Sequence, residues 1–132
     1  MRGRGRGHRG RWRAASRRPV RFLEPTLLLL LHHGPAHGYT LIDQLGRFNL
    51  SDVDPSAVYR VLRDMEGRGW VTSFWEEEQT QGPPRRVYRL TSMGDEVLTW
   101  WIEDLQESGE MIEQILAAYA RHMAEGKGEH HE

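Results

Sequence analysis

Arginine is the residue type whose distribution in this chain points most directly to chemistry. Nine arginines and no acidic residue lie within residues 1–21, whereas the other 111 residues carry nine basic and 19 acidic residues. The net charge of -1 therefore conceals a basic arm joined to an acidic body. Guanidinium groups bind phosphates by neutralising their charge, so the arm predicts a nucleic-acid partner.

The arm, which we place at residues 1–18, has glycine or arginine at almost every position of its first half. It has too few apolar groups to offset the entropy of ordering the chain, and we expect it to be disordered when alone. His8 and Trp12 are able to stack on bases. A solubilising tail is the plainer alternative, because the pattern carries no sequence code.

A second group of arginines lies on a helix predicted at residues 55–67. Its core face carries four apolar residues, Val58, Val61, Leu62 and Met65. The side chains off that face are Ser56, Tyr59, Arg60 and Arg63. On a body that is otherwise acidic, such a helix suits the major groove of DNA. The alternative is an ordinary solvated face whose arginines pair with Asp64 or Glu66.

Catalysis finds no support in the residues present. The chain has no cysteine, no glycine-rich phosphate loop and no Ser-His-Asp arrangement at a supporting spacing, so we predict no catalytic residue and no enzyme activity. The absence of cysteine also excludes disulfides and fits a reducing cytoplasm. No apolar run approaches the roughly 20 residues of a membrane span. We therefore expect a cytoplasmic protein with no membrane partner.

Histidines raise the separate possibility of a metal sensor, because His32, His33 and His37 lie close together in the sequence. A metal ion needs a closed set of ligands, and adjacent histidines on a helix diverge. We therefore predict core or surface roles for these histidines, no metal site and no cofactor. The acidic triplet at residues 76–78 is interpreted as a solvated face.

The elements that position these side chains follow from apolar periodicity and from helix start and stop signals. Residues 19–33 suit a buried helix with proline in its first turn, followed by Gly34. A second short helix is predicted to open at residues 37–39, with Tyr39, Ile42 and Leu45 on one face and Gly46 as its stop. Asp54 and Pro55 start the third helix as N-cap and first helical residue.

Two segments rich in β-branched and aromatic residues follow at 70–75 and 85–90, with a Gly-Pro loop at 79–84 between them. Helix, turn and helix followed by a hairpin is a winged helix. Arg85 and Arg86 lie where a wing would contact the phosphate backbone; alternatively, they pair with the acidic triplet across the strands. The predicted fold class is mainly α with a small β-hairpin (α+β), a winged helix-turn-helix plus a long C-terminal dimerisation helix.

Thr91 is predicted to cap a helix that runs to about residue 123. Its stripe, with steps of three or four, is Val97, Trp101, Leu105, Ser108, Ile112, Ile115 and Tyr119. A homodimer is the economical partner for it, with Trp101, Leu105, Ile112, Ile115 and Tyr119 as interface residues. Ser108 and Gly109 are a candidate kink. The expected domains are the arm at 1–18, a winged helix at 19–90, the dimerisation helix at 91–124 and a flexible tail at 125–132.

Trp100 and Trp101 are candidates for binding a small aromatic effector, because an indole wall stacks on planar ligands. Adjacent helical residues point about 100° apart, so only one of the two can face the seam. Core packing is the more common role of a large aromatic residue, and we favour it over effector binding here.

These residues together resemble the PadR-like family of winged-helix transcriptional regulators. The resemblance covers about residues 21–120 and rests on LEPTLLLLLHHGPAHGYTLIDQL, DPSAVYRVLRDMEGRGWV and RRVYRLTSMGDEVL. The specific combination is His37-Gly38-Tyr39, then Tyr59 with Leu62, then Tyr88, Leu90, Thr91 and Gly94 in that order. Any one of these motifs alone would be weak.

The resemblance implies a dimeric, ligand-responsive repressor that binds an inverted-repeat DNA operator. The short tail after Gly109 resembles that of members with one C-terminal helix, whereas the arginine-glycine arm is not part of the family pattern. By position, the resemblance makes these residues DNA contacts: Tyr39, Ser56, Tyr59, Arg60, Arg63, Arg85 and Arg86. The half-sites would lie roughly 34 to 36 Å apart.

One rival function stays open from the sequence. A non-specific nucleoid or RNA-binding protein would use the arm for binding and the winged helix as a scaffold. Binding by the arm alone falls equally for all sequences as salt rises, whereas binding by the third helix keeps a sequence preference.

Overall fold

The computed structural model describes residues 21–76 and 85–126 of the chain. The arm through residue 20, the hairpin loop at 77–84 and the tail from residue 127 lie outside the described residues. What the sequence predicts for these segments stays a prediction. The chain divides into two compact units, one that ends at Leu98 and one that begins at Thr99.

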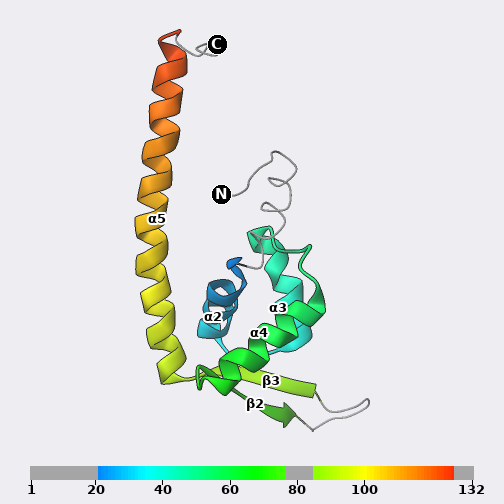
Figure 1. Cartoon of the computed structure of the whole chain (residues 1–132). Coiled ribbons are helices and arrows are strands. Elements are labelled where there is room, and N and C mark those ends of the chain that lie inside the picture. The colour runs from blue at the N-terminus through cyan, green and yellow to red at the C-terminus, as the bar shows by residue number, and fades with distance from the viewer. Residues whose placement is uncertain (1–20, 77–84, 127–132) are drawn as a thin grey trace, which may run out of the picture. The chain divides into compact units, whose positions relative to one another are not determined.

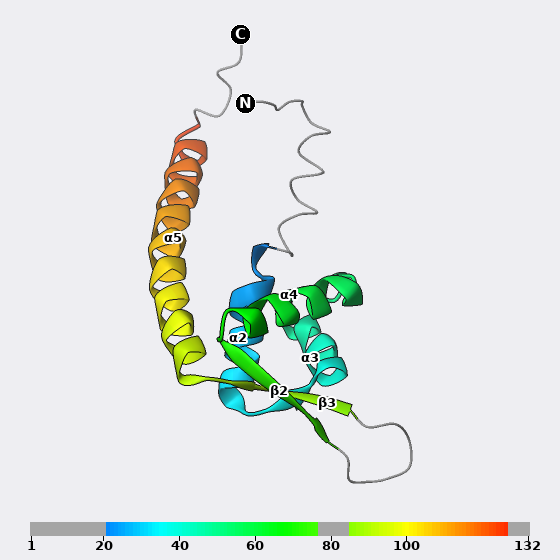
Figure 2. The same cartoon turned by 60° about the horizontal axis from the view of Figure 1, so that its bottom comes forward.

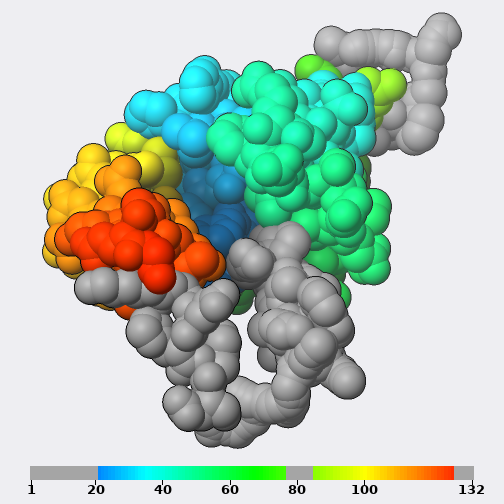
Figure 3. Space-filling model, turned by 90° about the horizontal axis from the view of Figure 1, so that it is seen from above, coloured from blue at the N-terminus to red at the C-terminus, as the bar shows by residue number. Residues whose placement is uncertain are grey.

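The first unit is built around α2 (Leu23–His33), the helix that carries the leucine run. Pro25 lies in its first turn, where a missing N–H costs no helical hydrogen bond. Leu27 and Leu28 have no exposed surface, as the predicted buried helix requires. In Figure 3 the blue atoms of α2 are set back behind the cyan and green atoms of the elements that follow. This helix therefore forms the centre of the hydrophobic core of the unit.

The second helix, α3 (Gly38–Gln44), leads into a 3-10 turn, η1 (Leu45–Phe48). The predicted stop at Gly46 is therefore wrong. The buried side chain of Leu45 anchors the additional turn in the core, and the chain leaves helical conformation only at Asn49, with φ 62°. Asparagine is one of the few residues that tolerate this left-handed conformation.

The third helix, α4 (Pro55–Gly67), has the predicted bounds. The Asp54 carboxylate accepts a hydrogen bond from the backbone N–H of Ser56 at 3.1 Å, which confirms the predicted N-cap. Val58, Leu62 and Met65 are fully buried. This face of α4 fixes which side chains the helix turns toward solvent.

The sheet has three antiparallel strands in the order β1 (Ala36–His37), β3 (Arg85–Leu90), β2 (Val71–Glu76). The sequence predicted the β2–β3 hairpin, which we call the wing, but not β1. Figures 1 and 2 show the wing below α4, with α2, α3 and α4 on one side of the sheet. Arg85 pairs in register with Glu76, and Val87 pairs with both Phe74 and His37.

The last helix, α5 (Ser92–Ala124), is unbroken, so Ser108 and Gly109 do not interrupt it. Thr91 caps it as predicted, because its hydroxyl accepts a hydrogen bond from the backbone N–H of Gly94 at 3.0 Å. Gly94 and Leu98 are the buried residues of α5. The first two turns of α5 thus belong to the winged-helix unit. Together, these elements confirm the predicted α+β fold class.

Candidate nucleic-acid interface

The exposed face of α4 gathers Ser56, Arg60 and Arg63, the polar residues that the sequence assigned to DNA. At about 100° per residue these three side chains fall within an arc of roughly 60°, opposite the buried face. Each of them is exposed. We call this surface, Ser56, Arg60 and Arg63, the α4 face. It presents two guanidinium groups and a hydroxyl, which suit phosphates and the acceptor edges of bases.

The two acidic residues near the α4 face have other partners. The Asp64 carboxylate pairs with Arg68 at 3.2 Å, and the Glu66 carboxylate accepts a hydrogen bond from the Ser73 hydroxyl at 2.7 Å. Within the described ranges, Arg60 and Arg63 form no ion pair with an acidic residue. The alternative in which Asp64 or Glu66 neutralises them is therefore not what this structure contains.

Tyr59 lies at the edge of the α4 face and is half-buried rather than exposed. Its ring lies against Gly38, the first residue of α3: a methyl group at Gly38 would be 2.6 Å from Cε1 of Tyr59. A side chain at position 38 would therefore displace the Tyr59 ring. Tyr59 therefore joins α4 to the start of α3, a role that its sequence spacing did not reveal.

Tyr39, which follows Gly38 in α3, links this helix to the wing. Nη1 of Arg85 donates a hydrogen bond to the Tyr39 hydroxyl at 2.6 Å, and the guanidinium carbon lies 5.1 Å from the centre of the Tyr39 ring. The Tyr39 ring also stacks on His37, with ring centres 5.2 Å apart. Nε2 of His37 is 2.8 Å from Oε1 of Glu76. These four residues, which we call the wing-base cluster, bring four elements together: β1, α3, β2 and β3.

The wing arginines do not pair with Glu76, contrary to one of the two alternatives drawn from the sequence. Glu76 is the register partner of Arg85, yet its carboxylate contacts His37. The sequence predicted a core or surface role for His37 but not this contact, because the short strand β1 that carries His37 was not predicted. Glu77 and Glu78 lie outside the described residues.

Arg86 lies on the opposite face of the sheet from Arg85 and is half-buried. Its Nε donates a hydrogen bond to the Ser73 hydroxyl at 3.0 Å, and its guanidinium carbon lies 4.8 Å from the centre of the Trp75 ring. Nearby Tyr88 is only 4% exposed. Burial raises the pKa of Tyr88 above its ordinary value, although the positive charge of Arg86 acts in the opposite direction. Arg86 thus stabilises the wing by joining β3 to β2 through its contacts with Ser73 and Trp75.

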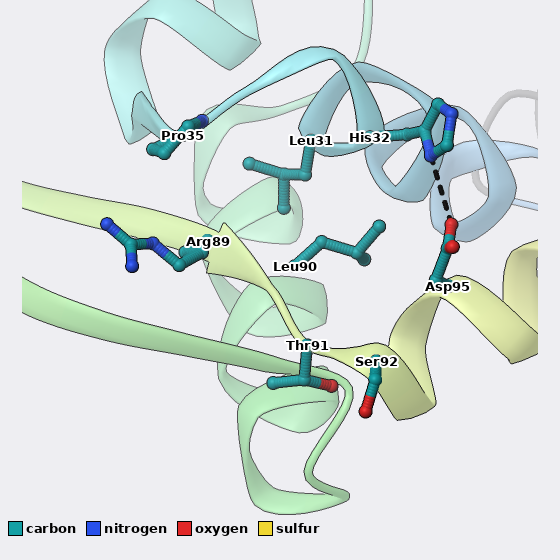
Figure 4. Close-up of a pocket in the computed structure, with 8 residues that line it drawn as sticks. All are labelled: Leu31, His32, Pro35, Arg89, Leu90, Thr91, Ser92 and Asp95. Carbon is teal, nitrogen blue, oxygen red and sulfur yellow. Dashed lines mark hydrogen bonds and ion pairs between the residues drawn. The ribbon is translucent and has the colours of Figure 1, made fainter.

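The histidines of α2 have protein partners as well. Nδ1 of His32 is 3.0 Å from Oδ1 of Asp95, and Nδ1 of His33 is 3.1 Å from the carbonyl oxygen of Leu29. Figure 4 shows the first pair beside an open depression of about 480 Å³, in which Leu31 and Leu90 lie between this pair and Arg89. Among residues 21–76 and 85–126, no group of three or more side chains is arranged to hold a metal ion.

The second unit exposes a long apolar surface on α5. Ile112, Ile115 and Tyr119 of the predicted stripe are 55–64% exposed, and Trp101 and Leu105 are half-buried. The sequence analysis omitted Leu116 and Met123, which fall in the same arc at about 100° per residue and are also exposed. We call the surface formed by these seven residues the α5 seam.

The two tryptophans of α5 have different surroundings. Trp100 is 61% exposed and lies well off the α5 seam, whereas Trp101 lies on it. Their rings meet edge to face, with centres 5.9 Å apart and an interplanar angle of 76°. They therefore do not form a single flat wall.

None of the helices in the described part of the chain is both long and apolar enough to span a membrane.

Comparison with known proteins gives a consistent result. Residues 27–99 match the model of the transcriptional regulator PadR-like family. The chain is 31% identical over 102 residues to transcriptional regulator Rv3488 of Mycobacterium tuberculosis, covering 75% of this chain and 90% of that protein.

Solved structures agree with this result. A PadR-like transcription factor of Bacteroides fragilis is 30% identical, with a TM-score of 0.63 over 78% of this chain and 98% of that one. A PadR family regulator of Clostridium difficile R20291 has a TM-score of 0.65 at 22% identity, over 72% of this chain and 98% of that one. The second likeness concerns the fold alone.

Proposed function

Because the chain belongs to the PadR-like family of transcriptional regulators, whose members bind DNA, we propose that it binds one operator sequence as a homodimer and represses transcription from it. In this proposal α4 enters the major groove and the wing contacts the adjacent phosphate backbone. The protein acts in the cytoplasm, and its operator is an inverted repeat, since a two-fold dimer presents two copies of α4.

The observation that carries the proposal is the composition of the α4 face. Two exposed arginines that form no ion pair with a described acidic residue stand opposite a fully buried apolar face. Arginine is the residue that most often reads guanine in the major groove. The contact of Tyr59 with Gly38, and that of Arg85 with Tyr39, connect this face to the wing. These contacts fix the distance between the α4 face, which would enter the groove, and Arg85, which would contact the DNA backbone.

The dimer is supported by the α5 seam. Large apolar side chains rarely remain exposed in a long continuous row, and a second copy of the same helix would cover them. We propose Trp101, Leu105, Ile112, Ile115 and Tyr119 as its interface. An aromatic effector bound beside Trp100 and Trp101 would then act by changing how the two copies pack; the exposed ring of Trp100 supports this second part of the proposal.

The test is selection of bound double-stranded DNA from a random pool by the full chain at physiological salt, followed by measurement of Kd on the selected site. Arg63→Ala should weaken binding about 10-fold and relax the preference at one base pair of each half-site. The matched control is Arg68→Ala, at the residue that follows the end of α4, since Arg68 is paired with Asp64; it should change Kd less than about twofold.

Recovery of an inverted repeat would support the proposal. If the full chain selects no motif, or if both substitutions weaken binding equally for all sequences, the non-specific nucleic-acid protein becomes the better account. In that case the nine arginines of residues 1–21 would supply the binding.

A further inference from the structure

The wing-base cluster contains an arrangement that simple strand pairing would not produce. Arg85 and Glu76 are directly opposite each other in the ladder, where side chains of opposite charge normally pair. Instead, the Glu76 carboxylate lies 2.8 Å from Nε2 of His37, and the Arg85 guanidinium is bound to Tyr39. The Glu76 carboxylate, which would otherwise neutralise Arg85, is thus bound by His37 instead.

Tyr39 determines the position of the guanidinium that His37 leaves uncompensated. One N–H of Arg85 donates to the Tyr39 hydroxyl at 2.6 Å, and the group also packs against the ring. A guanidinium has five N–H donors, so others remain for a ligand. Arg85 itself is exposed and forms no ion pair with an acidic residue within the described ranges. Among the described residues, its charge is held in place by Tyr39 without an acidic partner.

One connection between the cluster and the α4 face runs through Gly38. Tyr39 follows Gly38, whose backbone contacts the ring of Tyr59 on α4. The position of Arg85 relative to Arg60 and Arg63 therefore depends on van der Waals and hydrogen-bond contacts, not on the hairpin alone. This is the arrangement needed if Arg85 is to meet a phosphate while α4 lies in the neighbouring groove.

We propose that His37, Tyr39 and Glu76 are positioning residues that keep Arg85 exposed, unpaired with Glu76 and aimed at a DNA phosphate. The inference rests on the proposed DNA-binding function and assigns Tyr39 to an indirect role: it acts on DNA through Arg85. His37 acts one step further away, by holding the Glu76 carboxylate away from the arginine.

The first experiment is a double-mutant cycle of Tyr39→Phe and Arg85→Ala in the full chain, with Kd for the selected operator measured across a salt series. Arg85→Ala should weaken binding about 10-fold and lower the slope of log K against log salt by about 0.9, the value for one phosphate contact. Tyr39→Phe should weaken binding about threefold in the wild-type chain and less than about 1.5-fold in the Arg85→Ala chain. An undiminished effect of Tyr39→Phe in the Arg85→Ala chain would overturn the positioning role.

The second experiment is a rescue. His37→Phe keeps a ring for Tyr39 to stack on but releases Glu76, which should then pair with Arg85 and weaken operator binding about fivefold. Adding Glu76→Gln should restore at least half of that loss, beyond any effect that Glu76→Gln has alone. Asp64→Asn, which removes a carboxylate paired with Arg68, is the matched control and should restore nothing. Rescue by both substitutions, or by neither, contradicts the proposal.

Circular dichroism melting of every variant separates a loss of fold from a loss of binding, and a variant that unfolds at the assay temperature is replaced by His37→Leu or Arg85→Gln, which likewise remove the donor to Glu76 and the positive charge. A wild-type chain without operator preference refutes the proposed function. A wild-type chain that binds its operator while the cycle is additive refutes only the positioning role.

Discussion

Two glycines of the winged-helix unit are close-contact positions, but their neighbours differ. A Cβ at Gly38 would meet the ring of Tyr59 at 2.6 Å, whereas a Cβ at Gly94 would lie 2.1 Å from the backbone carbonyl oxygen of Trp70. A side chain at the edge of a surface is able to move, but a backbone carbonyl in the sheet-to-helix junction is not. The first glycine is therefore expected to matter for binding and the second for folding.

We predict that Gly38→Ala weakens operator binding about fivefold while lowering the free energy of unfolding by less than about 1 kcal/mol. Gly94→Ala should lower the free energy of unfolding by about 3 kcal/mol. Urea unfolding and operator titration measure the two effects. Gly67→Ala is the control, because that position has open space. Equal losses of stability in the Gly38 and Gly94 variants would contradict this distinction.

Tyr88 makes the free energy of unfolding depend on pH, and the direction follows from its pKa shift. Burial raises its pKa above the ordinary value of 10.0, so the folded chain retains the hydroxyl proton at pH values where the unfolded chain has lost it. Ionisation then favours the unfolded chain, and the contribution of Tyr88 to stability is constant below about pH 10 and lost as the pH rises further.

Urea unfolding at pH 8 and at about pH 11 checks this expectation. The wild-type chain should lose more stability between these two values than the Tyr88→Phe variant, because the variant has no proton to lose at that site. Identical losses in the two proteins would show that Tyr88 does not contribute.

At the scale of elements, the start of α5 is held by one hydroxyl. Thr91 Oγ1 donates to the carbonyl oxygens of Gly69 and Trp70, at 2.7 and 3.0 Å, and accepts from the N–H of Gly94. Thr91→Val keeps the shape and removes all three bonds, and it should lower the free energy of unfolding by about 2 kcal/mol. Thr91→Ser should recover most of this stability. Failure of serine to do so would mean that the methyl group, not the hydroxyl, is what holds α5.

At the scale of the whole molecule, the α5 seam predicts the oligomeric state. Ile112→Glu places a charge in the middle of the seam and should convert a dimer to monomers at micromolar concentration, with loss of operator binding. Gln114→Glu adds the same charge about 160° around the helix and should leave the dimer intact. Sedimentation velocity distinguishes the two. A wild-type monomer, or dissociation by both substitutions, would refute the proposed interface.

Local patterns in the sequence were sufficient for most of the fold. The pair Asp54 and Pro55 specified the start of α4, and the spacing of Val58, Leu62 and Met65 specified its buried face. The β-rich segments specified the hairpin, and Thr91 the start of α5. Each of these depends on residues a few positions apart, whose interactions are the same in most tertiary settings. The residues of the α4 face were identifiable for the same reason.

Only the tertiary structure decided the partners at the wing base and the extra turn that follows α3. His37 meets Glu76 across 39 residues and Arg85 meets Tyr39 across 46, and no periodicity encodes either contact. The extra turn after α3 forms because Leu45 is buried by distant residues, against the local preference of Gly46. Helix and strand signals are local, whereas the choice among several available charged and aromatic partners depends on which of them the folded chain brings within hydrogen-bond distance.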